Sequence, residues 1–393
     1  MSRTFQPLRR LCEDAVAAGV VPGAVVLFID GGQTRFQEAF GSRQLEPAVL
    51  PASLETIYDV ASLTKAVVTS VLCMRAVASG HLRLNGPVVS YLPEFSRRSA
   101  NRGGEPGSPT EPPPSHEADR EAVTVRHLLS HSAGLPAHRP FYLFPSIEGL
   151  PPLERRAAIQ QAAASEPLTS PPGARAVYSD LGFITLGWML ERVSGARLDQ
   201  LAEREIFRPL GLAATAFGPL AVTPEREIAA SERCAWRGRL LVGEVHDQNT
   251  WAMGGVAGHA GLFSTAADLA MIARALVAAW RGDHSGGGGP APLVDRDVIR
   301  EFWAPSGVPS SNWRLGWDGP SAHGSQAGER LARTAVGHLG FTGCSLWIDP
   351  ARERVIILLS NRVHPTVRDD PRFRAFRPAV QDAAIEAVEA IEE

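Results

Sequence analysis

The apolar pattern of the chain changes twice along its length, and this change limits the possible folds more than any other feature. Residues 23–30 and 34–41 have the spacing of two short strands, and Gly31-Gly32 between them is typical of a hairpin turn. Strand patterns return only after residue 310, in three apolar segments bounded by turn residues: 335–340, 343–350 and 354–361. The two ends of the chain are therefore expected to supply the strands of one sheet.

Helical spacing fills the rest of the pattern. Residues 62–80, 179–195 and 264–280 predict buried helices, and amphipathic helices are expected at 4–19 and from about residue 376. Strands at both ends with helices between them predict an α/β fold of the α+β kind. We expect one antiparallel sheet formed from both chain ends, flanked by helices, with an inserted all-helical subdomain.

The predicted organisation is a single domain over 1–393. Its sheet part would take residues 1–60 and 290–393, and its helical part residues 61–289. Residues 97–121 combine proline, glycine and charge, which predicts a mobile surface insertion. The glycine-rich stretch 281–292 predicts a flexible joint between the helical region and the C-terminal part.

Charge and cysteine content exclude several classes of protein. The formal net charge is −3, with no basic block, so no nucleic acid partner is expected. No apolar run approaches the length of a membrane span, and Glu13 and Asp14 interrupt the apolar region that a signal peptide needs. The four cysteines lie far apart, which favours free thiols in a reducing compartment. The expectation is a soluble cytoplasmic protein with no membrane partner.

Lys65 is the only lysine among 39 basic residues. Arginine stays charged, whereas a desolvated lysine can lose its proton and act as a base. Ser62 lies three residues earlier at the start of a predicted helix, which places both side chains on one face. We expect burial and the helix N-terminus to lower the pKa of Lys65, so that it activates Ser62 for acyl transfer. The alternative is that Ser62 only caps the helix and Lys65 lies along its surface.

Two further segments carry candidate polar groups. A Pro-Pro-Gly turn at 171–173 leads to Tyr178 and Asp180, at the opening of the next predicted helix. A core aromatic and a helix N-cap are the alternatives for these two residues. His338 and Gly340 lie on or beside a predicted strand whose small residues allow a substrate to approach the backbone. An ordinary residue at a sheet edge is the alternative for His338.

In this order, the Ser-x-x-Lys pair, the Tyr-Ser-Asp turn and the His-Leu-Gly strand resemble the three motifs of the serine β-lactamase and penicillin-binding-protein superfamily. The resemblance is nearest to the class C and esterase-like branch. Residues 125–136, 254–270 and 355–362 are similar to the same family, so the resemblance covers nearly the whole chain except 97–121. Residues 245–270 also resemble the members of this branch that are N-acetylmuramoyl-L-alanine amidases.

The resemblance implies a role for each matching residue. Ser62 is the nucleophile, Lys65 its base partner, and Tyr178 a second acid/base group that relays a proton to the leaving group. The backbone amides of Ser62 and Phe341 form the oxyanion hole. Substrate-binding residues would be Asp180, His338, Gly340 and His259. Such a serine site needs no cofactor and no metal.

Two departures from the family motifs narrow the range of expected substrates. Many relatives have asparagine where Asp180 stands, and an ionised aspartate can only accept hydrogen bonds, so it would hold Lys65 rather than a substrate carbonyl. Relatives that cleave β-lactams usually carry Lys-Thr-Gly where this chain has His338-Leu339-Gly340. A neutral His338 would bind a substrate carboxylate less firmly. We therefore rank penicillinase activity below general amide or ester hydrolysis.

The leading interpretation is a serine hydrolase that forms an acyl-enzyme on a small amide or ester, such as a muropeptide. The alternatives are a β-lactamase or D,D-peptidase-like enzyme and a non-catalytic ligand-binding protein on the same fold. His246, Asp247 and His259 are candidates for the pocket lining, with hydrogen-bonded loop residues as the alternative. No metal site is expected, because no His-Glu-x-x-His motif or cysteine pair accompanies them. The oligomeric state is left open.

Overall fold

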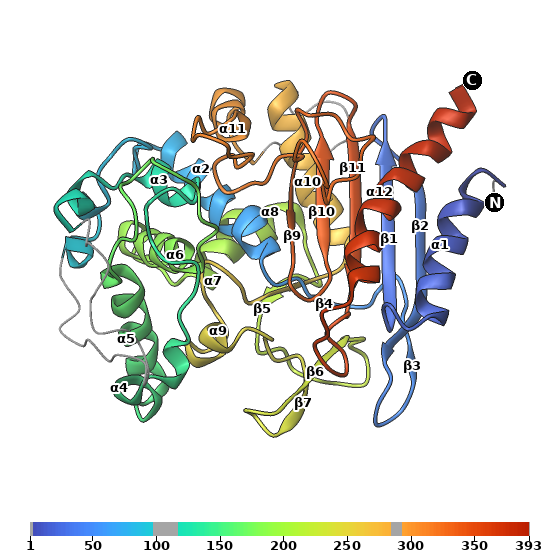
Figure 1. Cartoon of the computed structure of the whole chain (residues 1–393), viewed down its shortest axis with the longest axis horizontal. Coiled ribbons are helices and arrows are strands. Elements are labelled where there is room, and N and C mark those ends of the chain that lie inside the picture. Colours follow the sequence, from blue (N-terminus) through green and yellow to red (C-terminus); the bar gives the residue numbers. More distant parts are fainter. Residues whose placement is uncertain (1–2, 97–116, 284–292, 393) are drawn as a thin grey trace.

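The fold is built around a six-stranded sheet in the order β3-β2-β1-β11-β10-β9 (Figure 1). The computed structural model describes residues 3–96, 117–283 and 293–392. All neighbouring strands of the sheet pair antiparallel. The strands are β1 (Gly23–Asp30), β2 (Gln33–Gln44), β3 (Leu50–Pro51), β9 (Val336–Leu339), β10 (Ser345–Asp349) and β11 (Arg354–Ser360). Because β1 from one chain end pairs with β11 from the other, the predicted sheet is confirmed.

Strand β1 is buried along its whole length, which explains its continuous apolar sequence. Side chains alternate between the two faces of a strand. Val25 and Leu27 accordingly join one apolar core, while Val26 and Phe28 join the other. The sheet is therefore covered on both faces.

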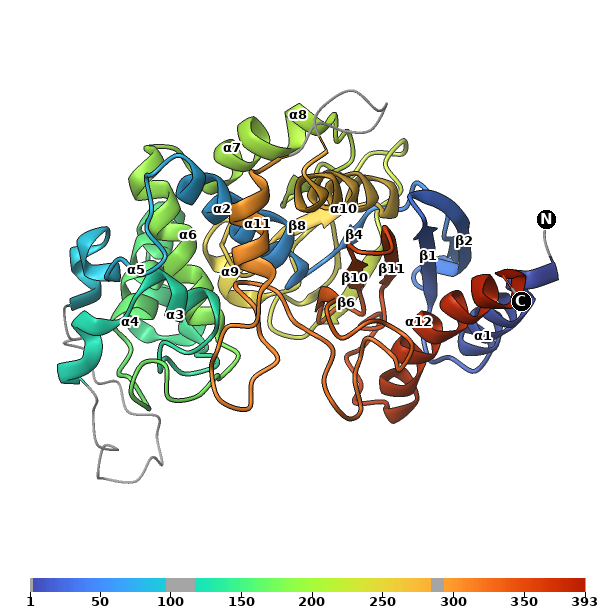
Figure 2. The ribbon, with the colours of Figure 1, turned by 90° about the horizontal axis from the view of Figure 1, so that it is seen from above.

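Helices from distant parts of the chain form these covers (Figures 1 and 2). Helices α1 (Gln6–Ala17) and α12 (Pro371–Glu392) lie side by side on the face of Phe28, and α10 (Ala266–Arg281) lies on the opposite face. Helix α12 begins earlier than the predicted start near residue 376. The reason is a start signal, since Asp370 accepts a hydrogen bond from the Arg372 N–H and Pro371 occupies the first helical position.

The remaining helices lie beside the β9 edge of the sheet (Figure 1). The predicted helix at 62–80 is confirmed as a π-helical segment η2 (Lys65–Ser70) that continues into α2 (Val71–Ala78). The predicted helix at 179–195 is α6 (Asp180–Ser194), which begins at a Ser179 cap and ends at the left-handed Gly195. The other helices are α3 (Val125–Leu129), α4 (Pro145–Glu148), α5 (Pro152–Ser165), α7 (Leu198–Ala202), α8 (Arg208–Leu210), α9 (Gln248–Ala252) and α11 (Arg296–Trp303).

The middle of the chain is not wholly helical, which corrects the prediction of an all-helical insertion. Strand β8 (Leu262–Ser264) pairs with β4 (Tyr58–Asp59) and with β5 (Ala216–Phe217). Strands β6 (Ala230–Cys234) and β7 (Arg239–Val242) form a separate hairpin. These strands are too short to show a two-residue period in the sequence.

Several predictions fall on parts of the chain that the structure leaves out. Of the predicted insertion 97–121, residues 97–116 lie outside the described residues, and so do residues 284–292 of the predicted joint and the proposed boundary at 289–290. Within the described ranges, no helix is both long and apolar enough to cross a bilayer. The four cysteines are free, as their wide spacing predicts, and all four are buried.

Candidate active site

Ser62 lies in a tight turn between β4 and the helix that contains Lys65. Ala61 before it has a φ of 47°, a left-handed conformation that residues with a Cβ seldom adopt. The Ala61 N–H donates to Asp59 Oδ1 at 2.8 Å, and the His246 N–H donates to Asp59 Oδ2 at 2.7 Å. Buried Asp59 therefore holds the turn in a strained shape that leaves the Ser62 side chain only partly buried.

Lys65 is fully buried and directs its ammonium group at Ser62. Lys65 Nζ lies 2.9 Å from Ser62 Oγ, 3.0 Å from the His259 carbonyl oxygen and 2.8 Å from Asp180 Oδ1. The two side chains share one face, as their three-residue spacing predicts. No side chain caps the segment that begins at Lys65, so the alternative of Ser62 as a simple cap is not what the structure shows.

Asp180, the first residue of helix α6, and Tyr178, which lies just before the Ser179 cap, reach the same place. Ser179 caps this helix by accepting the Gly182 N–H, so the alternative of Asp180 as the N-cap is wrong. Asp180 instead pairs with Lys65 through Oδ1, and its Oδ2 lies 3.5 Å from His138 Nδ1. The Tyr178 ring centroid lies 4.8 Å from Lys65 Nζ. The structure thus brings the serine, lysine, tyrosine and aspartate of two separate motifs together.

The turn after β9 completes the site with backbone groups. Thr342 Oγ1 donates to the Asp59 carbonyl at 2.7 Å, which ties this turn to the one that holds Ser62. A Cβ on Gly340 would lie 2.6 Å from the Val60 carbonyl oxygen, so only glycine permits this approach. The predicted reason for Gly340 was room for a substrate, whereas the structure shows close packing against Val60. Within the described ranges, no acceptor contacts the N–H of Ser62 or of Phe341.

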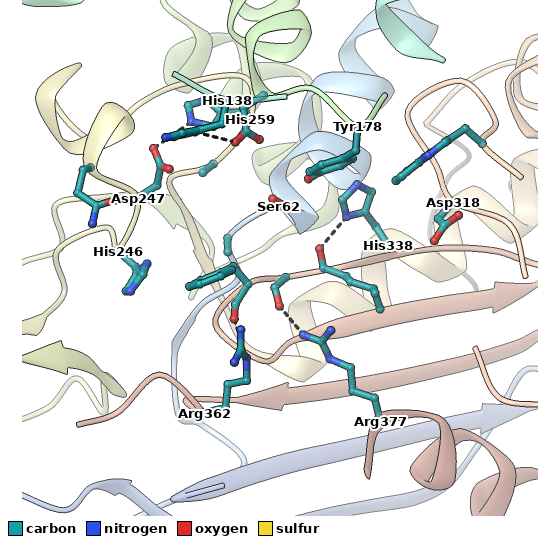
Figure 3. A pocket seen from close by; sticks show the side chains of 18 residues that line it. Ser62, His138, Tyr178, His246, Asp247, His259, Asp318, His338, Arg362 and Arg377 are labelled. Carbon is teal, nitrogen blue, oxygen red and sulfur yellow. Dashed lines mark hydrogen bonds and ion pairs between the residues drawn. The ribbon is translucent and has the colours of Figure 1, made fainter. Parts of the chain in front are cut away.

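These elements surround a pocket of about 600 Å³ (Figure 3). Besides Ser62, Tyr178 and Asp180, three groups of residues line it. Three histidines and Asp247 lie on one side, Trp313 and Asp318 lie on another, and the turn after β9 with two arginines forms the third. They include His138, His246, Asp247, His259, Trp313, Asp318, His338, Gly340, Phe341, Arg362 and Arg377. All the residues predicted for catalysis and substrate binding line this pocket except Lys65, which is buried and contacts Ser62 from the protein interior.

Similarity to known proteins shows the family to which this site belongs. A family model described as Beta-lactamase matches residues 8–380. The chain belongs to the beta-lactamase family. It is 31% identical over 389 residues to the N-acetylmuramyl-L-alanine amidase of Bacillus subtilis (strain 168), covering 94% of this chain and 83% of that protein. It is 29% identical to the putative D-alanyl-D-alanine carboxypeptidase of Escherichia coli (strain K12), over 88% of this chain and 80% of that protein.

Solved structures of this beta-lactamase-family fold extend the comparison. The octameric penicillin-binding protein homologue from Pyrococcus abyssi has a TM-score of 0.68 and 24% identity, covering 94% of this chain and 75% of that one. EstCE1, a hydrolase with promiscuous acyltransferase activity, has a TM-score of 0.71 and 19% identity, covering 97% and 98%. At these identities the two structures establish the fold. The family, with its serine–lysine pair, makes this chain a serine hydrolase that acts on an amide or an ester.

The protonation of the beta-lactamase-family site differs from the sequence prediction. Burial alone would lower the pKa of Lys65, but the Asp180 carboxylate and the Tyr178 hydroxyl beside it raise that pKa above its ordinary value. The prediction of a lowered lysine pKa is therefore wrong. Burial raises the pKa of Tyr178, even though Lys65 and Ser62 act in the opposite direction. The pKa of Asp180 is lowered despite burial, chiefly by Lys65. The resting site therefore holds an ammonium, a carboxylate and a neutral phenol.

His338 occupies the third-motif position as a neutral group. Burial, and the positive charge of Lys65, lower the pKa of His338 to about 3. Its Nδ1–H donates to the Leu339 carbonyl at 2.8 Å, which leaves Nε2 as an acceptor without a partner among the described residues. The lowered pKa supports the neutral His338 that the sequence analysis assumed, and its weak attraction for a substrate carboxylate stays a prediction.

His246, Asp247 and His259 line the pocket, and Asp247 and His259 are also hydrogen-bonded within the loop that carries them. His259 Nε2 lies 2.9 Å from Asp247 Oδ1, and Asp247 caps α9 by accepting the Thr250 N–H at 2.7 Å. Desolvation acts to raise the pKa of half-buried Asp247, but the neighbouring His259 lowers it more, so the pKa lies below its ordinary value. The ranges that the structure describes contain no group of three His, Cys, Asp or Glu side chains able to hold a metal.

Several residues of the site were not predicted individually. The His131 ring packs against both Tyr178 and Trp313, at centroid distances of 4.7 and 4.5 Å, and its Nδ1 accepts the Ser179 N–H. It belongs to the segment 125–136, whose family resemblance was the available signal. Burial raises the pKa of Asp318 to about 7 at the rim of the pocket. Arg362 ends the segment 355–362, whose family resemblance was the available signal, whereas no sequence signal marked Arg377; both arginines lie below the turn after β9 (Figure 3).

Proposed function

We propose that the protein hydrolyses an amide bond of a muropeptide through an acyl-enzyme on Ser62. The observation that carries the proposal is the 2.9 Å distance between Lys65 Nζ and Ser62 Oγ at the wall of an open pocket. The 31% identity to an N-acetylmuramyl-L-alanine amidase supports the substrate class. A pocket of about 600 Å³ has the size of an ordinary small-molecule site.

In the proposed acylation step, Ser62 Oγ attacks the carbonyl carbon of the scissile amide. The carbonyl oxygen becomes an oxyanion, which the N–H groups of Ser62 and Phe341 stabilise. The proton of Ser62 passes to a position shared by Tyr178 and Lys65, and Tyr178 delivers it to the leaving amine. Water then repeats these transfers in reverse to release the acid and restore Ser62.

The protonation of the resting site adds a condition to this mechanism. Lys65 is an ammonium and Tyr178 a neutral phenol, because both pKa values are raised. Neither can accept the proton of Ser62 in that state. The reactive form therefore carries one proton fewer than the resting form, and the acylation rate is expected to increase as the pH rises toward alkaline values.

A second candidate is a D-alanyl-D-alanine carboxypeptidase, favoured by 29% identity to proteins given that putative activity. Its substrate would end in a free carboxylate beside the scissile bond. The third-motif residue here is neutral His338, and Lys65 is already paired with Asp180. Amidase activity on a bond without that carboxylate fits these charges better.

The experiment combines active-site labelling with a substrate panel. A fluorophosphonate probe should label the protein at Ser62, as located by mass spectrometry, and Ser62→Ala should not be labelled. Muropeptides, p-nitrophenyl esters and nitrocefin are then tested separately as substrates of the unlabelled enzyme. Release of free peptide from a muropeptide supports the proposal. If Ser62→Ala is labelled as strongly as the wild type, the assignment of Ser62 as the nucleophile is wrong. If nitrocefin is the only substrate that is hydrolysed, the protein is a β-lactamase rather than an amidase.

We also propose the cytoplasm as the compartment of this chain. Its support is that the four cysteines are buried free thiols, the state that a reducing compartment maintains. Thiol labelling of the denatured protein from fractionated cells tests this, since four reactive thiols in the cytoplasmic fraction are expected.

A further inference from the structure

The turn after β9 is held from below by two arginines. Arg377 of α12 donates through Nη2 to the Gly340 carbonyl oxygen, and Arg362 donates through Nε to the Phe341 carbonyl oxygen at 2.9 Å (Figure 3). The guanidinium carbons lie 4.8 Å (Arg377) and 5.1 Å (Arg362) from the Phe373 ring centroid, so an aromatic face restricts both groups. Two consecutive peptide carbonyls are therefore bound by rigid cationic donors.

The Gly340 carbonyl belongs to the same peptide unit as the Phe341 N–H. The only cis bonds in the described ranges precede proline, so this peptide is trans, and its C=O and N–H point in opposite directions. A donor that fixes the carbonyl on the side of α12 therefore fixes the N–H on the opposite side. Ser62 lies across the turn from the two arginines (Figure 3), and the Phe341 N–H meets no acceptor among the described residues.

The charges below the turn add to this orientation. Within the described ranges, no carboxylate lies at ion-pair distance from Arg362 or Arg377. Burial, and the charge of Arg362, lower the pKa of Arg377 to about 10, so both side chains remain cationic at neutral pH. A cation that binds a carbonyl oxygen draws electron density from the whole peptide unit and makes its N–H a stronger donor.

We propose that Arg377 is a positioning residue of the oxyanion hole, which aligns and polarises the Phe341 N–H through the Gly340 carbonyl. This inference rests on the proposed function, because it presumes a reaction that forms an oxyanion beside Ser62. Arg362 fixes the following peptide and so stabilises the shape of the turn. A receptor for a substrate carboxylate is the competing role for Arg377, but its Nη2 is already occupied by Gly340 and its side chain is buried.

The test measures the acyl-enzyme carbonyl in Arg377→Met by infrared difference spectroscopy with a ¹³C-labelled acyl group. A strong oxyanion hole lowers the stretching frequency of the acyl carbonyl, so the variant should show this band at a higher frequency than the wild type. Removal of one oxyanion donor typically costs about 10²–10³-fold in kcat, so weakening one should cost about 10- to 100-fold in acylation. KM for a neutral p-nitrophenyl ester should change little, while the Kd of a boronic acid that forms a tetrahedral adduct should increase.

Two further variants make the outcome specific. Arg354→Met removes another buried arginine, on β11 and paired with Asp30 away from the pocket, and should leave the band in place. Arg377→Lys keeps a cation without the planar fork and should give a smaller shift of the same sign. If Arg377→Met does not fold, the lysine variant alone decides, and a band identical to that of the wild type then contradicts the inference.

The possible failures can be told apart. If the fluorophosphonate probe does not label Ser62 of the wild type, the proposed function is wrong and no acyl-enzyme exists to compare. If Ser62 is labelled normally but Arg377→Met keeps the wild-type band and acylation rate, only the positioning role is wrong. If Arg377→Met only raises KM for esters that bear a carboxylate, the positioning role is also wrong, and Arg377 is instead a receptor for that carboxylate.

Discussion

The ion pair between Asp180 and Lys65 leads to a prediction about both stability and rate. At 2.8 Å, two unit charges attract each other by about 6 kcal/mol at an effective dielectric constant of about 20. This attraction opposes the burial of Lys65, whose side chain is fully enclosed, and keeps the lysine protonated. Asp180→Asn removes the charge with little change of shape, so burial becomes the largest remaining influence on Lys65. We therefore expect the pKa of Lys65 to fall in this variant.

The loss of stability can be estimated from the same pair. Leaving one partner of a buried ion pair without the other typically costs about 3–5 kcal/mol. An unfolding entropy of about 2.1 cal/mol/K per residue gives about 0.8 kcal/mol/K for 393 residues, so the melting temperature should fall by about 4–6 °C.

The pH dependence of this loss has a definite sign. In the wild type, the raised pKa of Lys65 means that its contribution is complete below its ordinary value of about 10.4 and is lost as the pH rises through the folded value. The lowered pKa of Asp180 means that its contribution is complete above its ordinary value of about 3.9 and is lost as the pH falls through the folded value. In Asp180→Asn the lysine pKa is lowered, so raising the pH from 7 toward 10 should reduce the deficit relative to the wild type.

The assay follows melting temperature by calorimetry and kcat/KM for a p-nitrophenyl ester across pH. The acidic limb of the kcat/KM profile should move to lower pH in Asp180→Asn, because the reactive, singly deprotonated form becomes easier to reach. Asp199→Asn, in the first turn of α7 and in an exposed pair with Arg197, is the matched control and should cost less than about 1 kcal/mol. An acidic limb that stays in place or moves upward would refute the assignment of Asp180 as the group that holds Lys65 protonated.

Three further predictions concern the chemistry around Ser62. Lys65→Arg should keep the charge but form no acyl-enzyme in a mass-spectrometric assay, because guanidinium cannot release its proton; wild-type acylation would contradict this. Tyr178→Phe should lower kcat by about 10²–10⁴-fold with an unchanged circular dichroism spectrum. A smaller loss of kcat would show that Tyr178 is not the proton relay. Gly340→Ala places a Cβ 2.6 Å from the Val60 carbonyl oxygen and should displace the turn, with a stability loss of about 1–3 kcal/mol and reduced acylation. A fully active, equally stable alanine variant would show that the turn can adapt.

The sequence predicts the sheet well because its central strands are long and apolar. Residues 23–30 and 354–361 carry enough β-forming side chains to be recognised, and their positions at opposite chain ends led directly to the pairing of β1 with β11. The strands between residues 216 and 264 were missed because two to five residues show no period. Their formation depends on tertiary contacts rather than on local pattern.

The site was predictable where its groups are close in sequence and less so where they meet through the fold. Ser62 and Lys65 lie one helical turn apart, so their contact followed from spacing. The sequence indicated that Asp180 would hold Lys65, but the direction of the lysine pKa shift was predicted wrongly, because that prediction rested on burial and the helix N-terminus and not on the carboxylate that α6 brings to 2.8 Å. Arg377 was missed for a different reason, since it binds a backbone carbonyl, and no side-chain motif records such a partner.

The pairing of β1 with β11 also has a consequence during synthesis. While the ribosome is still making residues 354–360, one edge of β1 has no hydrogen-bonding neighbour, and its apolar side chains lack their final cover. The nascent chain is therefore exposed to misassociation until β11 emerges. In the proposed mechanism, hydrolysis can begin only after the turn that follows β9 has been made, because this turn carries the Phe341 N–H, whereas Ser62 and Lys65 are made much earlier.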